Sequence, residues 1–492
     1  MKRIALSTLP LLAANVARPN YDVGALGIGI VHLGLGAFHR AHQAVYTDDA
    51  IALSGDDWGI CGVSLKSSTA RDQLAAQDNL YSVREVTGGA DRWRVIGAIR
   101  ESLFAGDQLS AIIARIAQAE THIVSLTVTE KGYCADIAKR EPLWTHPDIA
   151  HDLERVDQPI SALGVLVAGL YERFRKRGAP MTILCCDNLP DNGGVLQALV
   201  HSFAARVHAQ MLPWLRDNVA FPSSMVDRIV PATKNHDVSD SEAALGLRDE
   251  GVVRAEPFSQ WVIEDKFLTP RPDWHRVGVQ FVNDVAPFEA MKLRLLNGAH
   301  SLLAYSGALE GIDTIAETVA RPAFRAAALG LMRESATSLD PVEGVDIERY
   351  QAQLLERFAN AALGHRTWQV ATDGSQKLPQ RLVAPAAVRL ARGQGSPFAA
   401  YAIAAWIVYL FERNFRGVTH TVADARAPHF SGLRELLPDD LQAFAAAVLD
   451  DEQVFAAVGK TPSFREQVLR NVALIGSDGT EFAAQQVDSP RF

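Results

Sequence analysis

A short segment near the middle of the chain carries the side chains best suited to proton chemistry. Between Phe288 and His300 the sequence is largely apolar, but it contains a carboxylate, an amine, an amide and an imidazole, from Glu289, Lys292, Asn297 and His300. A helix turns by about 100° per residue, so these four side chains fall within roughly 140° of one another. The spacing predicts one broad polar helix face that could line a cleft.

This set matches what the oxidation of a secondary alcohol needs. A base must take the hydroxyl proton as hydride leaves the carbon, and a lysine can do so when burial lowers its pKa. Asn297 and His300 could donate hydrogen bonds to the developing alkoxide, and no metal is then required. An ordinary surface ion pair between Glu289 and Lys292 explains the same spacing, and the spacing alone favours it.

A glycine-rich turn lies near the N-terminus, between a predicted buried strand at residues 29–34 and a predicted helix at about 38–50. Its first glycine permits a tight turn, and its second lets the backbone approach a pyrophosphate at the helix start. A histidine replaces the usual third glycine, so the turn is modified. A turn without any ligand remains an equal alternative from this motif alone. The expected cofactor-binding residues are Gly34, Leu35, Gly36, Ala37, Phe38, His39 and Arg40.

The next predicted strand, at about 58–65, bears on the choice of cofactor. An acidic residue after it would bind the ribose 2′-hydroxyl of NAD, but none occurs before Asp72. Lys66 and Arg71 could instead tolerate the 2′-phosphate of NADP, or they could be solvated loop cations. The choice between NAD and NADP stays open at this point.

The order of the predicted elements indicates an α/β protein. Short apolar runs at about 58–65, 123–128 and 181–186 alternate with helical patterns, which predicts a parallel sheet covered on both faces. From about residue 288 the sequence is helical with few candidate strands. We therefore expect a Rossmann-type domain at residues 1–285 and a mostly helical domain at residues 286–492.

Composition excludes several classes of protein. The net charge of −9 over 492 residues argues against a general nucleic-acid binder, although one cationic pocket would suffice for a small anionic substrate. The longest apolar run, at about 399–411, is too short to span a bilayer and is expected to be a buried helix. No convincing signal peptide is present, so a cytoplasmic protein is expected.

The four cysteines do not suggest a metal site. Cys61, Cys134, Cys185 and Cys186 form no CxxC pair and no cysteine–histidine set with zinc spacing. Small buried thiols in a reducing compartment are the expected state. The sequence does not decide between a monomer and a dimer.

Five motifs together resemble the mannitol dehydrogenase family, the long-chain, zinc-independent polyol and sugar-acid dehydrogenases, over nearly the whole chain. They are Ile30 to Gln43 around the glycine-rich turn, Val124 to Tyr133, Cys186 to Pro190, Met225 to Ile229, and the Lys292, Asn297, Gly298 and His300 set. The resemblance implies an expanded Rossmann domain followed by a mostly helical domain. It also favours Lys292 as a catalytic base over the alternative of a surface ion pair with Glu289.

The resemblance assigns roles residue by residue. Lys292 is similar to the family's general base, and Asn188 and Asn297 to the amides that hold the reacting oxygen. His300 resembles a substrate-orienting residue, and Glu130 a proton-relay carboxylate that could equally be a strand-end loop residue. Two further substrate contacts are implied, at Asp227, which an ion pair or a helix cap would also explain, and at Lys377.

Three features favour a sugar acid over a polyol within this family. Residues 129–133 include Lys131, as in fructuronate reductases, where mannitol-type relatives resemble Glu-Gly-Gly. Gln369 stands where mannitol-type relatives carry an arginine, and the segment around Lys377 resembles the fructuronate reductase version. The loop after residue 65 lacks the acid of NAD-specific mannitol enzymes. Lys131 and Arg381 could pair with a carboxylate, or both could be exposed cations.

The expected reaction is therefore interconversion of D-mannonate and D-fructuronate by hydride transfer with NAD(H), with NADP not excluded. The nearest alternative is a polyol or ketose dehydrogenase acting on mannitol, arabinitol, sorbitol or tagaturonate. A non-catalytic dinucleotide-binding sensor is a further alternative, but the retention of Lys292, Asn297, His300 and Asn188 argues against it.

Overall fold

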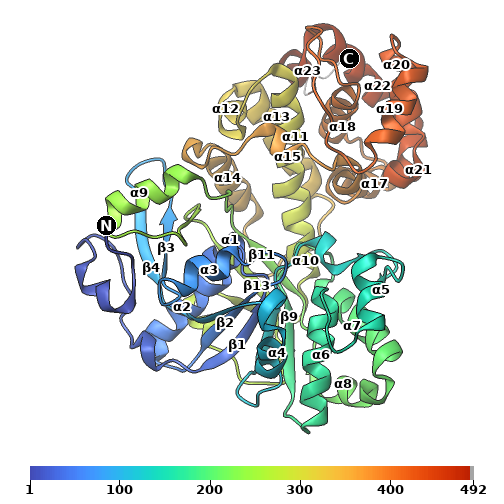
Figure 1. Ribbon diagram of the computed structural model, residues 1–492. Coiled ribbons are helices and arrows are strands. Elements are labelled where there is room, and N and C mark those ends of the chain that lie inside the picture. The colour runs from blue at the N-terminus through green and yellow to red at the C-terminus, as the bar shows by residue number, and fades with distance from the viewer. Residues whose placement is uncertain (488–492) are drawn as a thin grey trace. The chain divides into compact units, whose positions relative to one another are not determined.

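The computed structural model describes residues 1–487 of a chain that divides into two compact units, Met1–Ala286 and Pro287–Phe492 (Figure 1). The first unit is built on a parallel sheet, and the described part of the second consists of helices and loops. The expected fold class is confirmed.

The central sheet of the first unit has six strands, all paired in parallel. Its strand order, β10-β9-β6-β1-β2-β5, places β1 in the middle, with the chain extending first to one side and then to the other. This is the doubly wound arrangement, in which ligands bind at the carboxyl ends of the strands. The strands are β1 (Ile28–Leu33), β2 (Gly59–Ser64), β5 (Ile99–Phe104), β6 (Ile123–Leu126), β9 (Met181–Cys185) and β10 (Val219–Ala220).

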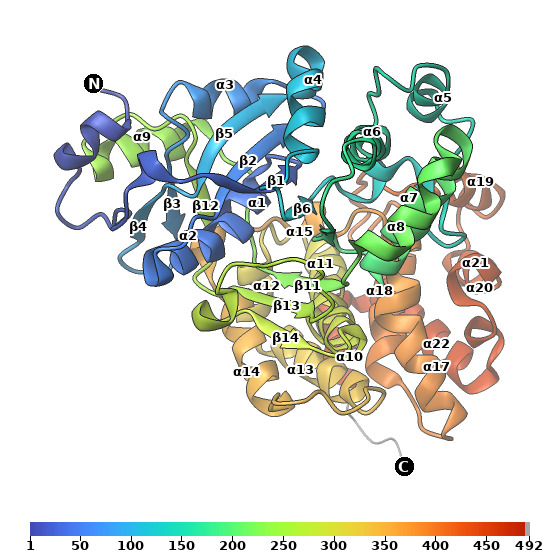
Figure 2. The same ribbon diagram turned by 90° about the horizontal axis from the view of Figure 1, so that it is seen from below.

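Alternation along the strands explains why both faces of this sheet are covered. In β1, Val31 and Leu33 pack in the core formed with α4, α6 and α7, whereas Ile30 packs in the core formed with α1 and α2. Figure 2 shows α4 and α2 on opposite sides of β1 and β2. Successive side chains point to opposite faces, so a strand that is buried on both must be apolar throughout. The helices are α1 (Ala37–Ala41), α2 (Gln43–Ser54), α3 (Thr69–Ala75), α4 (Ala105–Ile116), α5 (Pro147–Glu154), α6 (Ala162–Arg175), α7 (Asn192–Val207), α8 (Leu212–Asn218) and α9 (Asn235–Leu245).

The helix expected at about 38–50 is interrupted. Its backbone leaves helical geometry at His42, which has φ −128° and ψ −87°, so α1 ends and α2 begins there. One ring nitrogen of His42 lies 2.9 Å from the carbonyl oxygen of Gln260 in β13. A tertiary contact at the break explains why the local sequence pattern did not reveal it.

Smaller sheets complete the first unit. One joins β12 (Val253–Ala255), β3 (Tyr81–Glu85) and β4 (Arg92–Ile96), and another joins β11 (Ser224–Asp227), β13 (Gln260–Glu264) and β14 (Gln280–Val282). A short ribbon pairs β7 (Ala135–Asp136) with β8 (Glu141–Pro142). The sheet that contains β11 lies beside β9, because the Ser224 hydroxyl in β11 donates a hydrogen bond to the Cys185 carbonyl in β9 at 2.6 Å.

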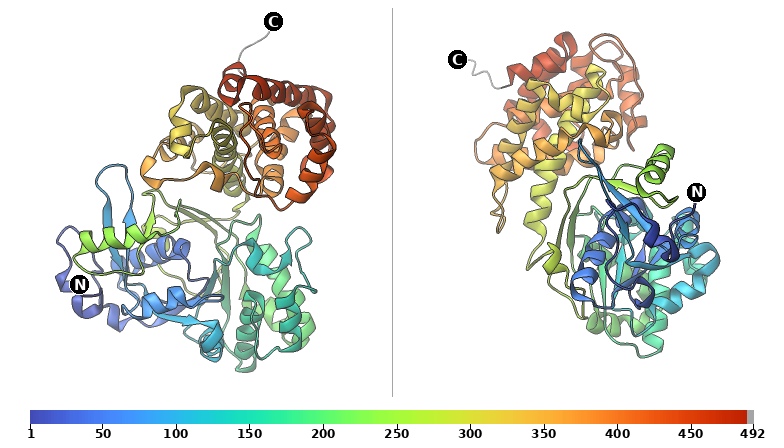
Figure 3. Two further views of the ribbon diagram at one scale, coloured as in Figure 1. Left: turned by 45° about the horizontal axis from the view of Figure 1, so that its top comes forward. Right: turned by 90° about the vertical axis from the view of Figure 1, so that its left-hand side faces the viewer.

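The helices of the second unit appear from yellow to red in Figure 3, and five of those described, α12, α13, α15, α18 and α23, pack against α11 (Gly298–Glu310). The apolar run expected to be a buried helix is α18 (Pro397–Leu410), whose residues 399–410 are all buried, which confirms that prediction. No helix in residues 1–487 is both long and apolar enough to cross a membrane. The other helices are α10 (Ala286–Met291), which begins at the end of the first unit, α12 (Ile315–Ala320), α13 (Pro322–Ala336), α14 (Ile347–Phe358), α15 (Thr367–Val370), α16 (Gly374–Leu378), α17 (Ala384–Ala391), α19 (Ala427–Leu436), α20 (Leu441–Leu449), α21 (Glu452–Phe455), α22 (Pro462–Asp478) and α23 (Thr480–Gln486).

Candidate active site

The glycine-rich turn follows β1 and needs each of its two glycines for a different reason. Gly34 has φ +109°, and a Cβ there would lie 2.1 Å from the Thr127 carbonyl oxygen. A Cβ on Gly36 would meet only the Gly34 carbonyl oxygen, at 3.8 Å. The first glycine therefore permits the turn to close against the end of β6, and the second leaves open space over the backbone, as a pyrophosphate requires.

A buried histidine fixes this turn from behind. His32 in β1 contacts the Ser125 hydroxyl and the Thr127 hydroxyl, each at 2.8 Å, and the Gly34 carbonyl at 3.1 Å. His39 stacks on His32 with ring centroids 3.4 Å apart. Burial lowers the pKa of His32 to about 3 and also lowers the pKa of His39, so both rings are neutral at physiological pH. His39 thus supports the turn without bringing a charge to it.

Arg40 also turns inward. Its guanidinium donates to the carbonyl oxygens of Gly36, at 3.3 Å, and Gly251, and it lies over the Tyr81 ring at 5.7 Å. The Tyr81 hydroxyl donates to the Arg40 carbonyl at 2.7 Å. With 7% of its surface exposed, Arg40 holds the backbone of the turn in place.

The polar residues after β6 and β9 meet at one edge of the sheet, because these strands pair in parallel with Leu126 opposite Cys185. Glu130 and Lys131 begin a short 3-10 turn, η3 (Glu130–Tyr133), and both are exposed. Asn188 is exposed beyond the end of β9. The structure therefore brings together the three site residues expected at these two strand ends.

Asp187 joins these two strand ends. Its carboxylate accepts hydrogen bonds from the Thr129 N–H at 2.8 Å, the Val128 N–H at 3.1 Å and the Tyr133 hydroxyl at 2.7 Å. Thr129 has φ +67°, a strained value for a β-branched residue, and the bond to its amide helps to hold it there. Burial raises the pKa of Asp187, and the three donors oppose that shift. Asp187 therefore determines where Glu130 lies relative to Asn188.

Asp227 is the last residue of β11 and is 5% exposed. No helix in residues 1–487 has Asp227 as its N-cap residue, so the structure gives the helix-cap alternative no support. Its neighbour Arg228 donates to the Glu85 carboxylate at 2.8 Å and to the Ala41 carbonyl at 2.6 Å.

Asn192 connects the start of β11 to the end of β9. Its side-chain amide donates hydrogen bonds to the carbonyl oxygens of Asp187 and Ser224, at 2.9 and 2.7 Å.

In the second unit, Lys292 and Asn297 are the first and last residues of a π-helical segment, η6 (Lys292–Asn297), between α10 and α11. The Gly298 N–H donates to the Leu293 carbonyl, five residues back. Residues five apart come onto one face in such a segment, whereas an α-helix would separate Lys292 and Asn297 by about 140°. The broad polar face expected from α-helical spacing is thus narrower in the structure.

His300 lies one turn further along, on α11, and is buried. Its ring packs against Phe358 and His365, with centroids 5.2 and 4.8 Å away. The pKa of His300 is well below its usual value, first because of burial and then because of cations that include Arg381, Arg357 and Lys377. Within residues 1–487 its Nε2 atom has no hydrogen-bond partner. A neutral ring with a free nitrogen in a cationic setting is suited to an oxygen-rich, anionic ligand.

A second π-helical segment, η8 (Pro379–Val383), carries Arg381 and packs on η6. Arg381 donates to the Ser301 hydroxyl at 3.1 Å, and that hydroxyl donates to the Asn297 carbonyl at 3.0 Å. Lys377 donates to the Thr372 carbonyl at 2.7 Å. The second unit therefore groups Arg381 with Asn297 and His300, and Lys377 contributes to the same positive potential.

Comparisons with known proteins match both units. The family model for the mannitol dehydrogenase Rossmann domain matches residues 28–276, and the model for the mannitol dehydrogenase C-terminal domain matches residues 284–475. The chain belongs to the mannitol dehydrogenase family. The resemblance expected from the motifs is confirmed, and the chain is an oxidoreductase with a Rossmann-type dinucleotide-binding domain.

The names of similar proteins include both a sugar-acid oxidoreductase and polyol dehydrogenases. D-mannonate oxidoreductase of Escherichia coli is 42% identical over 482 residues, covering 97% of this chain and 96% of that protein. A mannitol 2-dehydrogenase of Aspergillus fumigatus is 40% identical over 84% of each chain. The structure of Pseudomonas fluorescens mannitol 2-dehydrogenase with NAD and D-mannitol is 37% identical, with a TM-score of 0.88 over 99% of both chains.

Some residues at the site of this mannitol dehydrogenase family member could not be assigned a role from the sequence. Asp187 is one of them, and its position directly before Asn188 at a strand end is the signal in the sequence that could have marked it. Arg357 and His365 lie far from His300 along the chain, and no local pattern marks them. Their contribution becomes visible only when α14 and the segment before α15 pack beside α11.

Proposed function

We propose that the protein interconverts D-mannonate and D-fructuronate by hydride transfer with NAD(H), with Lys292 as general acid and base. The observation that carries this proposal is the buried, neutral His300 with a free ring nitrogen, set among Arg357, Lys377 and Arg381. It lies about one helical turn from Asn297 and about two from Lys292. The E. coli D-mannonate oxidoreductase, similar over 97% of this chain, supports the choice of substrate.

The glycine-rich turn fits the cofactor. The open backbone at Gly36 and the tight turn at Gly34 provide the cradle that a pyrophosphate needs, with Leu35, Ala37 and Phe38 alongside. His39 and Arg40 hold that backbone from behind. These residues would hold NAD(H), which would supply the hydride acceptor for the alcohol carbon in its oxidised form and the hydride donor for the ketone carbon in its reduced form. The named NAD complex of the Pseudomonas fluorescens relative supports this assignment.

Lys292 handles the proton of the reacting hydroxyl. In oxidation its neutral amine takes that proton, and in reduction its ammonium gives the proton to the ketone oxygen. Asn297, which the π-helical segment brings to the same face, donates a hydrogen bond to this oxygen. The family resemblance assigns Asn188 as a second amide donor and Glu130 as a proton relay.

The positive surroundings of His300 favour a sugar acid. Arg381 supplies a planar set of donors that matches a carboxylate, and Lys377 adds charge. On the family resemblance, we assign Lys131 to a substrate carboxylate and Asp227 to a substrate hydroxyl. His300 orients another hydroxyl through its free nitrogen.

A substrate panel tests this function against the polyol alternative that the mannitol 2-dehydrogenase relatives suggest. Purified protein and NADH are assayed with D-fructuronate, D-tagaturonate and D-fructose, and kcat/KM is compared. We expect fructuronate to be the best substrate. Arg381→Gln should raise KM for fructuronate by roughly tenfold or more, because it removes a charge-assisted hydrogen bond. Faster reduction of fructose than of either uronate would overturn the proposal.

A further inference from the structure

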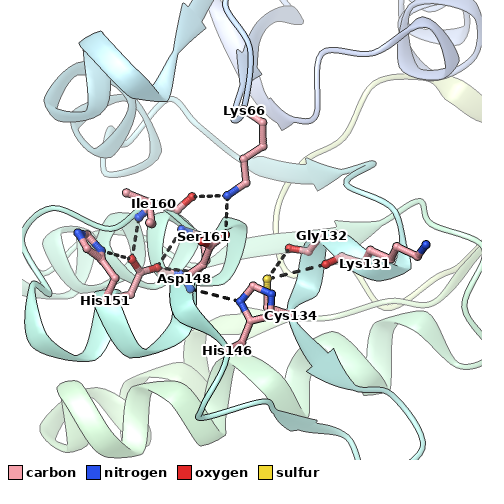
Figure 4. Close-up of polar contacts among 11 residues, drawn as sticks. Lys66, Lys131, Gly132, Cys134, His146, Asp148, His151, Ile160 and Ser161 are labelled. Atoms are coloured by element: carbon pink, nitrogen blue, oxygen red, sulfur yellow. Dashed lines mark hydrogen bonds and ion pairs between the residues drawn. The ribbon is translucent and has the colours of Figure 1, made fainter. Parts of the chain in front are cut away.

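Lys66, two residues after β2, makes an ion pair that the sequence did not reveal. Its Nζ atom lies 2.6 Å from Oδ2 of Asp148, at the start of α5, and 3.5 Å from the Ile160 carbonyl oxygen (Figure 4). The Lys66 side chain is 65% exposed and the Asp148 side chain 25%. The pair is therefore open to solvent and to a ligand.

The topology of the sheet places this ion pair across the cofactor crevice. Lys66 follows β2, and Asp148 follows β6; these strands are the two neighbours of β1, which carries the glycine-rich turn. The strand order reverses between β1 and β6, and open α/β sheets bind dinucleotides in the crevice at that point. Lys66 thus follows one neighbour of β1, and the ion pair brings to it Asp148, which lies in the connection that follows the other neighbour.

The charges in this region explain the absence of an acid after β2. Lys66 by itself would attract the 2′-phosphate of NADP, but Asp148 neutralises it. The other cation of the loop, Arg71, is held by Asp72 at 2.6 Å and by Asp107 at 2.9 Å, and it also donates to Gln108. Both cations that could have favoured a 2′-phosphate therefore have carboxylate partners.

We propose that Asp148 sets the preference of this protein for NAD over NADP. It supplies, from the helix after β6, the negative charge that an acidic residue at the end of the second strand usually supplies. Asp148 both cancels the attraction of Lys66 for a 2′-phosphate and repels that phosphate itself. The inference rests on the dinucleotide site of the proposed function and names the residue that selects its ligand.

The same carboxylate also belongs to a group of potential metal ligands. The ligand atoms of Cys134, His146 and Asp148 lie within 4.8 Å of one another. However, Lys66 is bound to the Asp148 carboxylate, His146 Nδ1 accepts the Asp148 N–H at 3.2 Å, and burial raises the pKa of Cys134. The group thus contains its own cation, which favours a role in recognition over a metal site.

Calorimetric titration with NAD+ and with NADP+, without substrate, tests the inference. Asp148→Asn should tighten NADP+ binding by roughly tenfold and change NAD+ binding by less than about threefold. The double variant with Lys66→Ala should lose that gain, and Lys66→Ala alone should weaken NADP+ binding. The control Glu154→Gln removes the same charge from an exposed position at the end of α5 and should leave the ratio of the two Kd values unchanged.

An unchanged ratio of Kd values in Asp148→Asn, with NAD+ still bound, would overturn this inference and leave the proposed function intact. If the wild-type protein binds neither NAD+ nor NADP+, the cofactor assignment on which this inference rests is wrong. Stoichiometric zinc in the purified wild-type protein that is lost in Asp148→Asn would assign the carboxylate to a metal and also overturn the inference.

Discussion

Asp187 is a buried residue whose contacts determine where two proposed site residues, Glu130 and Asn188, lie. Its carboxylate holds two backbone amides and the Tyr133 hydroxyl, and so fixes the turn that carries Glu130. The same residue directly precedes Asn188. One buried charge thereby fixes the positions of two proposed site residues, which makes Asp187 a positioning residue.

Replacing Asp187 with Asn should therefore lower turnover more than cofactor binding. The amide puts N–H donors where three donors already point, so the turn at Thr129 shifts. We expect kcat to fall by about 10- to 100-fold, while the Kd for NAD+ stays within about threefold of wild type. Stopped-flow turnover and calorimetric binding measure the two effects.

Asp191→Asn is a matched control, because it removes the same charge from an exposed residue four positions away that pairs with Arg140. It should leave kcat near the wild-type value. Equal losses of kcat and of NAD+ affinity in Asp187→Asn would mean that Asp187 has a general structural role and does not specifically position the turn.

Residue types were the part of the site most accessible to prediction from sequence. Lys292, Asn297 and His300 could be found because the functional groups that suit proton transfer and alkoxide stabilisation happen to lie close together in this chain, and because the family resemblance favours a catalytic role for them. Their electrostatic setting could not be found this way. His300 is neutral because of burial and because of cations from α14, α16 and η8, which only the packing brings beside it.

Among the elements, the π-helical segment η6 departs most from what the sequence suggested. An α-helical reading places Lys292 and Asn297 about 140° apart, whereas i to i+5 bonding brings them to one face. A helical periodicity carries no signal for one extra residue per turn. The break at His42 between α1 and α2 is similar, since its cause includes a contact with β13.

The contacts of His32 tie β1, β6 and the glycine-rich turn into one element, and they predict acid sensitivity. Burial lowers the pKa of His32 from 6.5 to about 3, so the unfolded chain binds the proton more tightly. Stability is therefore lost as pH falls from about 6.5 toward 3, by up to about 1.4 kcal/mol per pH unit. His32→Asn should remove that part of the pH dependence.

Urea unfolding at several pH values between 7.5 and 5 measures this effect. The free energy of unfolding of the wild-type protein should fall more steeply with acid than that of His32→Asn. If the free energy of unfolding falls equally with pH in the wild type and in His32→Asn, His32 is not the buried, neutral histidine proposed here.

At the scale of the whole molecule, the sequence predicted the parallel sheet and the helical second half because both rest on local periodicity. It did not predict the two three-stranded sheets. β12 pairs with β3 and β11 pairs with β13, across large separations in the chain, and their short strands show no clear alternation. Such pairings are decided by tertiary packing, so Asp227 could be named but not placed.

The whole molecule works as a dehydrogenase, on this account, because one lysine moves the proton while NAD carries the hydride. The most direct test is Lys292→Ala assayed with NADH and fructuronate, alongside calorimetric titration with NAD+. We predict that kcat falls by about 10²- to 10⁴-fold while the Kd for NAD+ stays within about twofold. Added methylamine should restore part of the turnover, and the exposed-lysine control Lys176→Ala should behave as wild type. Turnover of Lys292→Ala near the wild-type rate would contradict the account.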